Sequence, residues 1–298
     1  MKARLNSLGI AFDPKDFAKN YEKRAFYLQH ELANHPLFTW DKLIELAHFL
    51  PTREVEINAG DVPISLPEGR DGKQGLSIEE TLKRIAELKT WVGLKKISLH
   101  PEYRALMDSA LDTLRPHIDP QFPGMYEREG FIFISSPHSV TPYHMDPEHN
   151  FLFHIMGKKT FTIFDKADRE IISEVDIENH YSMDNRKMIL KKEMESRGTR
   201  LELKPGQAIH VPINAPHHVC THDEVCISLS VTFRTPRGDQ RENVYRVNKK
   251  LRNAGIAPTP YGKSGWKDVA KAAFYETYHR LRYFKSSRTA RAGAVKKY

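Results

Sequence analysis

The chain has 298 residues, of which 40% are hydrophobic, so it is long enough to bury the core of one large globular domain with additions. No run of about 18 apolar residues occurs, which predicts a protein without a transmembrane helix. The formal net charge of +8 suits acidic partners, and the amino terminus lacks the apolar stretch of a secretory signal, so we expect a cytoplasmic protein with reduced cysteines.

The first 124 residues are predicted to be mainly helical. Four segments with apolar residues at helical spacing cover residues 13–25, 40–50, 77–91 and 101–114. Ser77 is the expected N-cap of the third segment, and the apolar face of that segment extends to Trp91. The fourth is expected to end before Pro116. Residues 57–75 contain several glycines and prolines and are predicted to form a loop.

Strand patterns replace helical ones after residue 124. Eight short segments with apolar residues and nearby turn signals cover residues 130–135, 141–146, 151–156, 160–164, 201–203, 208–211, 217–221 and 225–234. Short strands with frequent turns are typical of a β-barrel or sandwich. Residues 166–200 are highly charged and are expected to form an insertion between two strands, which serves either in substrate selection or as a solvated surface excursion.

Helical spacing returns near the carboxyl terminus. Predicted helices cover residues 240–253 and 266–284, and we expect the apolar stripe of the second to pack on the chain's own barrel. The segment from His279 to Tyr298 has seven Lys or Arg and no acid. Such a tail attracts nucleic acid, acidic protein or an anionic membrane, although a solvated terminus is the interpretation that we favour. The expected organisation is a helical region at 1–124, a strand-rich core at 125–235 and C-terminal helices with a basic tail at 236–298.

A short segment in the middle of the chain combines two metal-binding side chains. His144 and Asp146 are separated by one residue, and alternate side chains of a strand share a face, so these two are expected to point together. His217 lies 71 positions after Asp146 on another predicted strand. Two imidazoles and a carboxylate on one side of a metal are typical of non-haem Fe(II), with the opposite side open for O2 and a co-substrate. A lone His-x-Asp also occurs by chance, so the surrounding sequence has to decide.

The surrounding sequence contains six features in a fixed order, which are Thr141-Pro142, Asn150, Gly157-Lys158-Lys159, Pro205-Gly206, His217-His218 and the strand from Ser228 to Phe233. Over residues 125–235 this order and spacing resemble the JmjC and cupin-like Fe(II)- and 2-oxoglutarate-dependent oxygenases. The similarity is greatest to the branch that contains the asparaginyl hydroxylase of hypoxia-inducible factor. The resemblance implies a mainly β core, a double-stranded β-helix (jelly-roll) barrel, with N-terminal and C-terminal helices.

The resemblance also implies that His144, Asp146 and His217 are the iron ligands. Strand alternation alone leaves the choice between His217 and the adjacent His218 open, and the resemblance favours His217. The other histidines of this region are expected to be ordinary polar or packed residues rather than a second metal site, and they are His149, His154, His210 and His222.

Three further residues match the co-substrate site of the family, and a fourth position, Thr232, corresponds to one of its residues but differs in type. Thr141 and Lys159 match the residues that bind the far carboxylate of 2-oxoglutarate, and Asn150 matches an amide that orients it. Position 232 is Thr where the asparaginyl hydroxylase has Asn, so this sequence departs from the pattern there. Burying a carboxylate without a partner would cost several kcal/mol, so a buried lysine at 159 makes physical sense, with Lys158 in the turn. The expected aromatic neighbour does not align, and its candidates are Tyr126, Phe131 and Phe133.

The resemblance implies an enzyme that couples O2 and 2-oxoglutarate decarboxylation to oxidation of a substrate C–H bond, a hydroxylase of a protein side chain or of a small metabolite. The resemblance also offers a homodimer that forms through the C-terminal helices as an alternative role for their apolar stripe. Two alternatives stay open. A non-oxidative metal-cupin isomerase or lyase would use the metal as a Lewis acid and would leave Thr141 and Lys159 unexplained. A non-enzymatic module binding nucleic acid through the basic tail would not need a complete ligand set.

Overall fold

The computed structural model describes residues 8–65, 72, 75–183 and 188–295. The chain divides into two compact units. The barrel unit comprises Met1–Ile172 and Lys187–Thr235, and the helical unit comprises Ser173–Arg186 and Pro236–Tyr298. No helix in the described residues is both long enough and apolar enough to cross a membrane.

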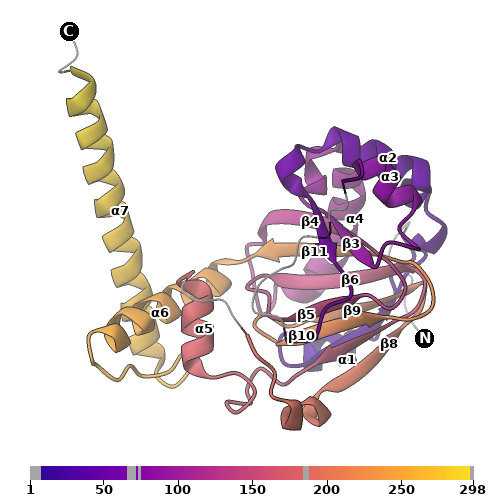
Figure 1. Cartoon of the computed structure of the whole chain (residues 1–298). Coiled ribbons are helices and arrows are strands. Elements are labelled where there is room, and N and C mark those ends of the chain that lie inside the picture. The colour runs from indigo at the N-terminus through magenta and orange to yellow at the C-terminus, as the bar shows by residue number, and fades with distance from the viewer. Residues whose placement is uncertain (1–7, 66–71, 73–74, 184–187, 296–298) are drawn as a thin grey trace. The chain divides into compact units, whose positions relative to one another are not determined.

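Two antiparallel sheets form the barrel unit (Figure 1). The strands of the larger sheet are, in spatial order, β1 (Phe26–Gln29), β9 (Gln207–Val211), β6 (His149–Met156), β11 (Cys226–Arg234), β4 (Tyr126–Ser135), β3 (Thr90–Leu94) and β2 (Val55–Ala59). Those of the smaller sheet are β5 (Val140–His144), β10 (His217–Thr221), β7 (Lys159–Ile163) and β8 (Thr199–Leu203). Backbone N–H groups of Val140 and Tyr143 donate to the carbonyls of Gly60 and Ile64, so the segment after β2 continues the smaller sheet beyond β5.

Helices cover the outer face of the larger sheet. They are α1 (Pro14–Asn20), α2 (Trp40–Phe49), α3 (Ile78–Lys83) and α4 (Pro101–Ile118). The barrel unit also has short 3-10 turns at Leu32–Asn34, Pro36–Phe38, Thr52–Glu54, Ile97–Leu99 and, just before β8, Lys192–Arg197. Figure 1 shows α2, α3 and α4 gathered beside β3 and β4. Leu43 of α2 and Leu111 of α4 are fully buried in one apolar cluster with Leu229 and Val231 of β11. This cluster is the main core and gives the sheet a rigid backing.

The inner faces of the two sheets enclose a smaller and partly polar interior. Leu152 of β6 and Ile209 of β9 form an apolar cluster there with Phe161 and Ile163 of β7. Because side chains alternate along a strand, the residues of β11 between those of the main core face this interior, and they are Ser228, Ser230 and Thr232. The candidate site is built on this polar inner face.

Three helices make up the described part of the helical unit, namely α5 (Glu174–Tyr181), α6 (Pro236–Asn253) and α7 (Gly265–Val295). The Arg252 guanidinium donates two hydrogen bonds to the buried Glu178 carboxylate, at 2.8 and 3.0 Å, which joins α6 to α5. The charged segment 166–200 therefore supplies one helix to the unit that contains the C-terminal helices. Trp266 and Leu281 on α7 are 73% and 61% exposed, so these two apolar residues are not covered within the described part of the helical unit.

The predicted fold class is confirmed, because the antiparallel sheets form a jelly-roll with flanking helices. Several element boundaries were wrong. Helix α3 ends at Lys83, and Trp91 belongs to β3, where the β-branched and aromatic residues 90–92 favour an extended backbone over helical spacing. Strand β2 overlaps the start of the segment 57–75 that was predicted to be a loop. Helix α1 ends at Asn20 and not at Ala25, and strand β1 begins directly after Ala25.

Two other boundaries differ for reasons of packing. Helix α4 continues through Pro116 to Ile118, and the complete burial of Ile118 offsets the loss of one hydrogen bond near the helix end. The strand predicted at 141–146 ends at His144, because the chain turns there toward β6. Asp146 therefore lies beyond the strand, and its position has to be fixed by other contacts.

Candidate metal centre

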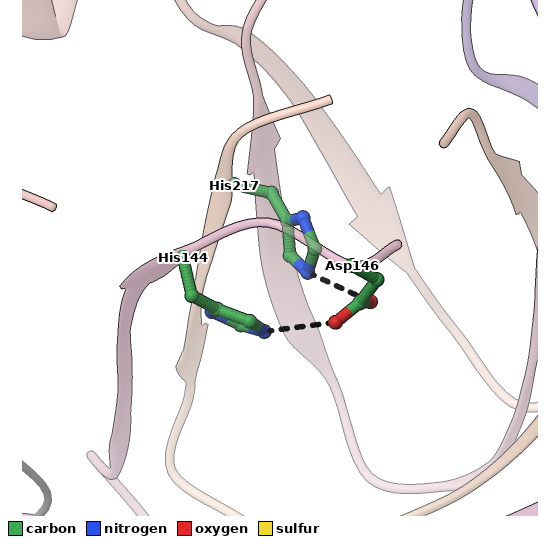
Figure 2. A group of neighbouring side chains, drawn as sticks. All are labelled: His144, Asp146 and His217. Atoms are coloured by element: carbon green, nitrogen blue, oxygen red, sulfur yellow. Dashed lines mark ion pairs between the residues drawn. The ribbon is translucent and has the colours of Figure 1, made fainter. Parts of the chain in front are cut away.

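The three predicted ligands lie together at one end of the barrel interior (Figure 2). Nε2 of His144 is 3.9 Å from Oδ1 of Asp146, and Nε2 of His217 is 3.7 Å from Oδ2. One ligand atom from each of the three residues lies within 4.8 Å of the others. No second group of at least three His, Cys, Asp or Glu side chains with this proximity occurs among the described residues.

A β-bulge aims the side chains of β5 at this point. β10 pairs with β5 at His217–His144 and again at Val219–Thr141, so β5 has one more residue than β10 between the two pairs. Residues directly opposite each other in antiparallel strands share a face. Thr141 therefore shares the inner face with His144 and His217 although it lies three residues before His144.

Hydrogen bonds of the two imidazole rings leave their Nε2 atoms free for a metal. Nδ1 of His144 lies 2.7 Å from the carbonyl oxygen of Pro142, and Nδ1 of His217 lies 2.9 Å from that of Ala215. A carbonyl only accepts, so each Nδ1 carries the proton and each Nε2 presents a lone pair toward Asp146. Burial, together with the neighbouring His144, lowers the pKa of His217 to about 4, so its ring is neutral at pH 7. Neutral imidazole is the form that binds metals.

The two adjacent histidines 217 and 218 point in different directions. His217 points inward, where it stacks on Phe161 with ring centroids 4.7 Å apart. His218 follows it on the strand and therefore faces the other side, where its ring lies 6.2 Å from that of Phe164. His218 is therefore not one of the three side chains that come together with ligand atoms close to one another.

Asn150 holds the carboxylate of Asp146 in place. Its Nδ2 donates to Oδ2 of Asp146 at 3.3 Å, and its Oδ1 accepts a hydrogen bond of 2.8 Å from the hydroxyl of Ser230. Thr232 pairs with Asn150 across the two strands and is 7% exposed, so it lies beside this network. Sequence reasoning nominated Asn150 for the co-substrate, whereas its contacts in the structure are with a predicted ligand and with Ser230.

Lys159 is a buried cation on the same inner face. It is 6% exposed, and its Nζ donates to the hydroxyl of Ser228 at 2.6 Å. It has no carboxylate partner within the part of the chain that the structure describes. Burial lowers the pKa of Lys159 to about 8, because no full negative charge compensates for the loss of water. Lys158 is exposed, in agreement with its predicted place in the turn.

These observations fit a bound metal and an anionic ligand. Two imidazoles and a carboxylate form the donor set, and a buried ammonium that could pair with an anion lies on the same face. Serines 228 and 230 were missed as site residues, yet the alternation of small polar and large apolar residues from Ser228 to Phe233 carried the signal.

The aromatic candidates lie in different environments. Phe131 and Phe133 alternate with buried core residues of β4, are half-buried, and face the interior with their rings 6.5 Å apart. Tyr126 begins β4 and is 39% exposed. The register of β4 with β11 places Phe133 opposite Ser228 and Phe131 opposite Ser230. The two phenylalanines are therefore on the inner face, beside the polar residues of β11.

The barrel unit contains a cavity of about 910 Å³, and the three predicted ligands are not among the described residues that line it. It lies between the segment of α1 and β1 and the end of β7, and its lining includes Ile163 and Ala215. Ile163 pairs with His217 across the strands, and the carbonyl of Ala215 bonds to the His217 ring. Four cations and two acids also line this cavity, namely Lys19, Lys23, Arg24, Lys166, Asp16 and Asp165.

Fold and sequence together define the class of this protein. Residues 76–239, more than half of the chain, match the family described as the cupin-like domain. The chain belongs to this family, which agrees with the jelly-roll sheets. No curated protein matches the chain.

Solved structures with the same fold include several of one bacterial protein. The structure of E. coli YcfD has 14% sequence identity and a TM-score of 0.53, covering 92% of this chain and 69% of that one. A structure described as the Escherichia coli ribosomal oxygenase YcfD has 15% sequence identity and a TM-score of 0.51, covering 92% of this chain and 68% of that one. The structure of the same protein in complex with cobalt and 2-oxoglutarate has 15% sequence identity and a TM-score of 0.50, covering 89% of this chain and 65% of that one. At these identities the similarity concerns the fold.

Proposed function

We propose that this protein is an Fe(II)- and 2-oxoglutarate-dependent oxygenase that hydroxylates its substrate. The observation that carries the proposal is the pairing of a three-residue ligand set with Lys159, a buried cation that has no carboxylate partner in the described chain. A metal site alone needs no such lysine. The ribosomal oxygenase that shares the fold has been crystallised with cobalt and 2-oxoglutarate, which supports the same pair of ligands here.

Each residue has a defined task in this proposal. His144, Asp146 and His217 would hold Fe(II) on one side, and Thr141 and Lys159 would bind the far carboxylate of 2-oxoglutarate. Bound iron would supply the activation of O2, with succinate, CO2 and a hydroxylated substrate as products. The chain itself positions the reactants and excludes water, because no acid–base or nucleophilic side chain is required.

Asn150 and Thr232 act on this site less directly in our proposal. Asn150 keeps the Asp146 carboxylate oriented, which is the usual contribution of a residue behind a metal ligand. Thr232 lies beside the same pocket, and its hydroxyl is shorter than the asparagine amide that the asparaginyl hydroxylase has at this position. The solved structures described above are of a ribosomal oxygenase, so we propose the broader oxygenase class and keep the asparaginyl-hydroxylase branch as a prediction.

We propose a protein side chain as the substrate in preference to a small metabolite. The description of the similar fold as a ribosomal oxygenase supports a macromolecular substrate. The test compares succinate formation by the full-length protein with two additions, a dialysed protein fraction from cells and the small molecules removed by dialysis. Stimulation by the protein fraction alone supports the proposal, and stimulation by the small molecules alone contradicts it.

The oxygenase proposal itself is tested with a matched pair of lysine variants. Lys159→Ala removes the buried counter-charge, and Lys158→Ala removes its exposed neighbour. Truncating one partner of a buried charge pair costs about 2–5 kcal/mol, so the KM for 2-oxoglutarate should rise about 30-fold or more in Lys159→Ala. Lys158→Ala should keep the wild-type KM. Metal-dependent turnover of a substrate without any need for 2-oxoglutarate would instead favour a non-oxidative cupin enzyme.

A further inference from the structure

The barrel unit contains a second group of titratable side chains, which centres on Glu22. Glu22 follows α1 with φ of 57°, a left-handed conformation that is uncommon for residues other than glycine. Its side chain is 5% exposed. The carboxylate lies 2.9 Å from Nδ1 of His149 and accepts a hydrogen bond of 3.1 Å from Nζ of Lys166. A buried charge in an uncommon backbone conformation persists only where its surroundings fix it.

The contacts of Glu22 keep its carboxylate ionised. Burial alone would raise the pKa of Glu22, but the charge of Lys166 and the neighbouring His149 and His210 hold this pKa well below its usual range. Nε2 of His210 is 3.4 Å from Oε1 of Glu22, and burial lowers the pKa of this histidine. Glu22 is therefore a negatively charged acceptor within the protein.

One further contact connects Glu22 to the metal centre. The backbone N–H of Ile213 donates to Oε2 of Glu22 at 3.1 Å. The next residue, Asn214, has φ of 61° and donates its N–H to the carbonyl of Asp146 at 2.9 Å. The carbonyl of Ala215 in turn accepts the hydrogen bond from Nδ1 of His217. Three successive residues of this turn thus contact Glu22, the backbone of Asp146 and the ring of His217.

We propose that Glu22 is a positioning residue of the metal centre, because it anchors the turn at 213–215 that fixes Asp146 and orients the ring of His217. The inference rests on the function proposed above. Glu22 lies 54 positions before the residues 76–239 that match the cupin-like domain. The N-terminal segment is therefore part of the working site and not an appendage to the domain.

A matched pair of neighbouring variants separates this role from general stabilisation. Glu22→Gln removes the charge that anchors the turn. Tyr21→Phe removes a hydroxyl that contacts the same network, since the Tyr21 oxygen lies 2.9 Å from Nδ1 of His149, but it leaves the bond to Ile213 intact. Two quantities are measured on the full chain without 2-oxoglutarate or O2. They are the dissociation constant for Mn(II) and, in the metal-free protein, the hydrogen exchange of the backbone amides at 213–217.

We expect Glu22→Gln to weaken Mn(II) binding about 10- to 100-fold, as residues behind metal ligands commonly do, and to accelerate exchange at 213–217. Tyr21→Phe should change neither. If Glu22→Gln does not fold, Glu22→Asp, which keeps the charge but shortens the side chain, takes its place with the same expected direction. Unchanged Mn(II) affinity in the Glu22 variant, or faster exchange spread evenly over the barrel unit, would overturn the inference.

The same measurements distinguish the failure of this inference from the failure of the proposed function. Wild-type protein that binds no divalent metal contradicts both. Wild-type protein that binds Mn(II) but never consumes 2-oxoglutarate with Fe(II) contradicts the oxygenase proposal alone. Normal 2-oxoglutarate consumption together with an unaffected Glu22 variant contradicts the positioning role alone.

Discussion

The two faces of β11 have opposite chemistry although they alternate residue by residue. Leu229 and Val231 point outward into the helix-covered core and are fully buried among apolar side chains. Ser228 and Ser230 point inward and bond to Lys159 and Asn150. The outer face stabilises the fold by removing apolar surface from water. The inner face gives up part of this stabilisation to keep hydroxyl groups, an amide and a cation in place.

This difference shows which part of the barrel the proposed chemistry constrains. A sheet that served stability alone would gain from apolar residues on both faces, since buried polar groups contribute little net free energy and are costly when unpaired. The inner face instead contains a cation at Lys159, which only an anionic ligand would fully compensate. Substitutions on the two faces should therefore separate stability from binding.

The largest expected effect is on the metal ligands. His217→Ala removes an inward ligand, so Fe(II) affinity should fall by at least about 100-fold and 2-oxoglutarate-dependent turnover should be lost. His218→Ala, one residue further along β10, should retain both because its ring faces away from the site. Isothermal titration with Fe(II) under anaerobic conditions measures the affinities. Equal losses in the two variants would contradict the assignment of His217.

A second pair of variants compares the two faces directly. Leu229→Ala leaves a cavity in the main core and should lower the free energy of unfolding by about 2–5 kcal/mol, with 2-oxoglutarate turnover per folded molecule unchanged. Ser230→Ala should cost only about 1 kcal/mol but should weaken metal binding, because Asn150 loses its hydrogen-bond donor. Urea denaturation and metal titration of both variants test this. Metal binding that is weakened in Leu229→Ala but not in Ser230→Ala would contradict the claim that the inner face serves binding and the outer face serves stability.

A smaller effect is the pH dependence of co-substrate binding. The pKa of Lys159 is lowered to about 8 in the free protein, so its ammonium form is half populated near pH 8, predominates at lower pH and is lost at higher pH. Affinity for 2-oxoglutarate should be constant below pH 8 and should fall by up to about tenfold per pH unit above it. The folded protein without ligand should gain stability from this group over the same range, since the unfolded chain binds the proton more tightly.

Affinities measured by anaerobic titration from pH 7 to pH 10 test this dependence, with Lys159→Met as the control. The variant has no ammonium at position 159, so its weaker binding should lack the decrease above pH 8. A wild-type affinity that stays constant up to pH 10 would mean that Lys159 does not carry the counter-charge.

The sequence was more informative about the candidate metal site than about the elements around it. Ligand chemistry limited the residue types and brought out His144 and Asp146, while the family resemblance selected His217 over His218. The resemblance also nominated Lys159, and strand alternation added only that one of the two adjacent lysines could face inward. The jelly-roll was predicted from the short strands and the family resemblance together.

The remaining features depend on contacts that no local pattern contains. The bulge that brings Thr141 onto the inner face exists only in the pairing of β5 with β10. The role of Trp91 in β3 depends on its neighbours β2 and β4, and local helical spacing predicted the wrong element. Glu22 lies more than a hundred residues from both His149 and Ile213, so its network could be recognised only in the folded chain.

The central claim is that one pocket holds Fe(II) and 2-oxoglutarate together, and an anaerobic spectroscopic titration tests it most directly. Fe(II) and then 2-oxoglutarate are added to the full-length protein while the visible metal-to-ligand charge-transfer band of an iron-chelated 2-oxo acid is monitored. We predict that the band appears in the wild-type protein and in His218→Ala, and that it is absent from His217→Ala. Iron binding without the band in the wild-type protein would contradict the account.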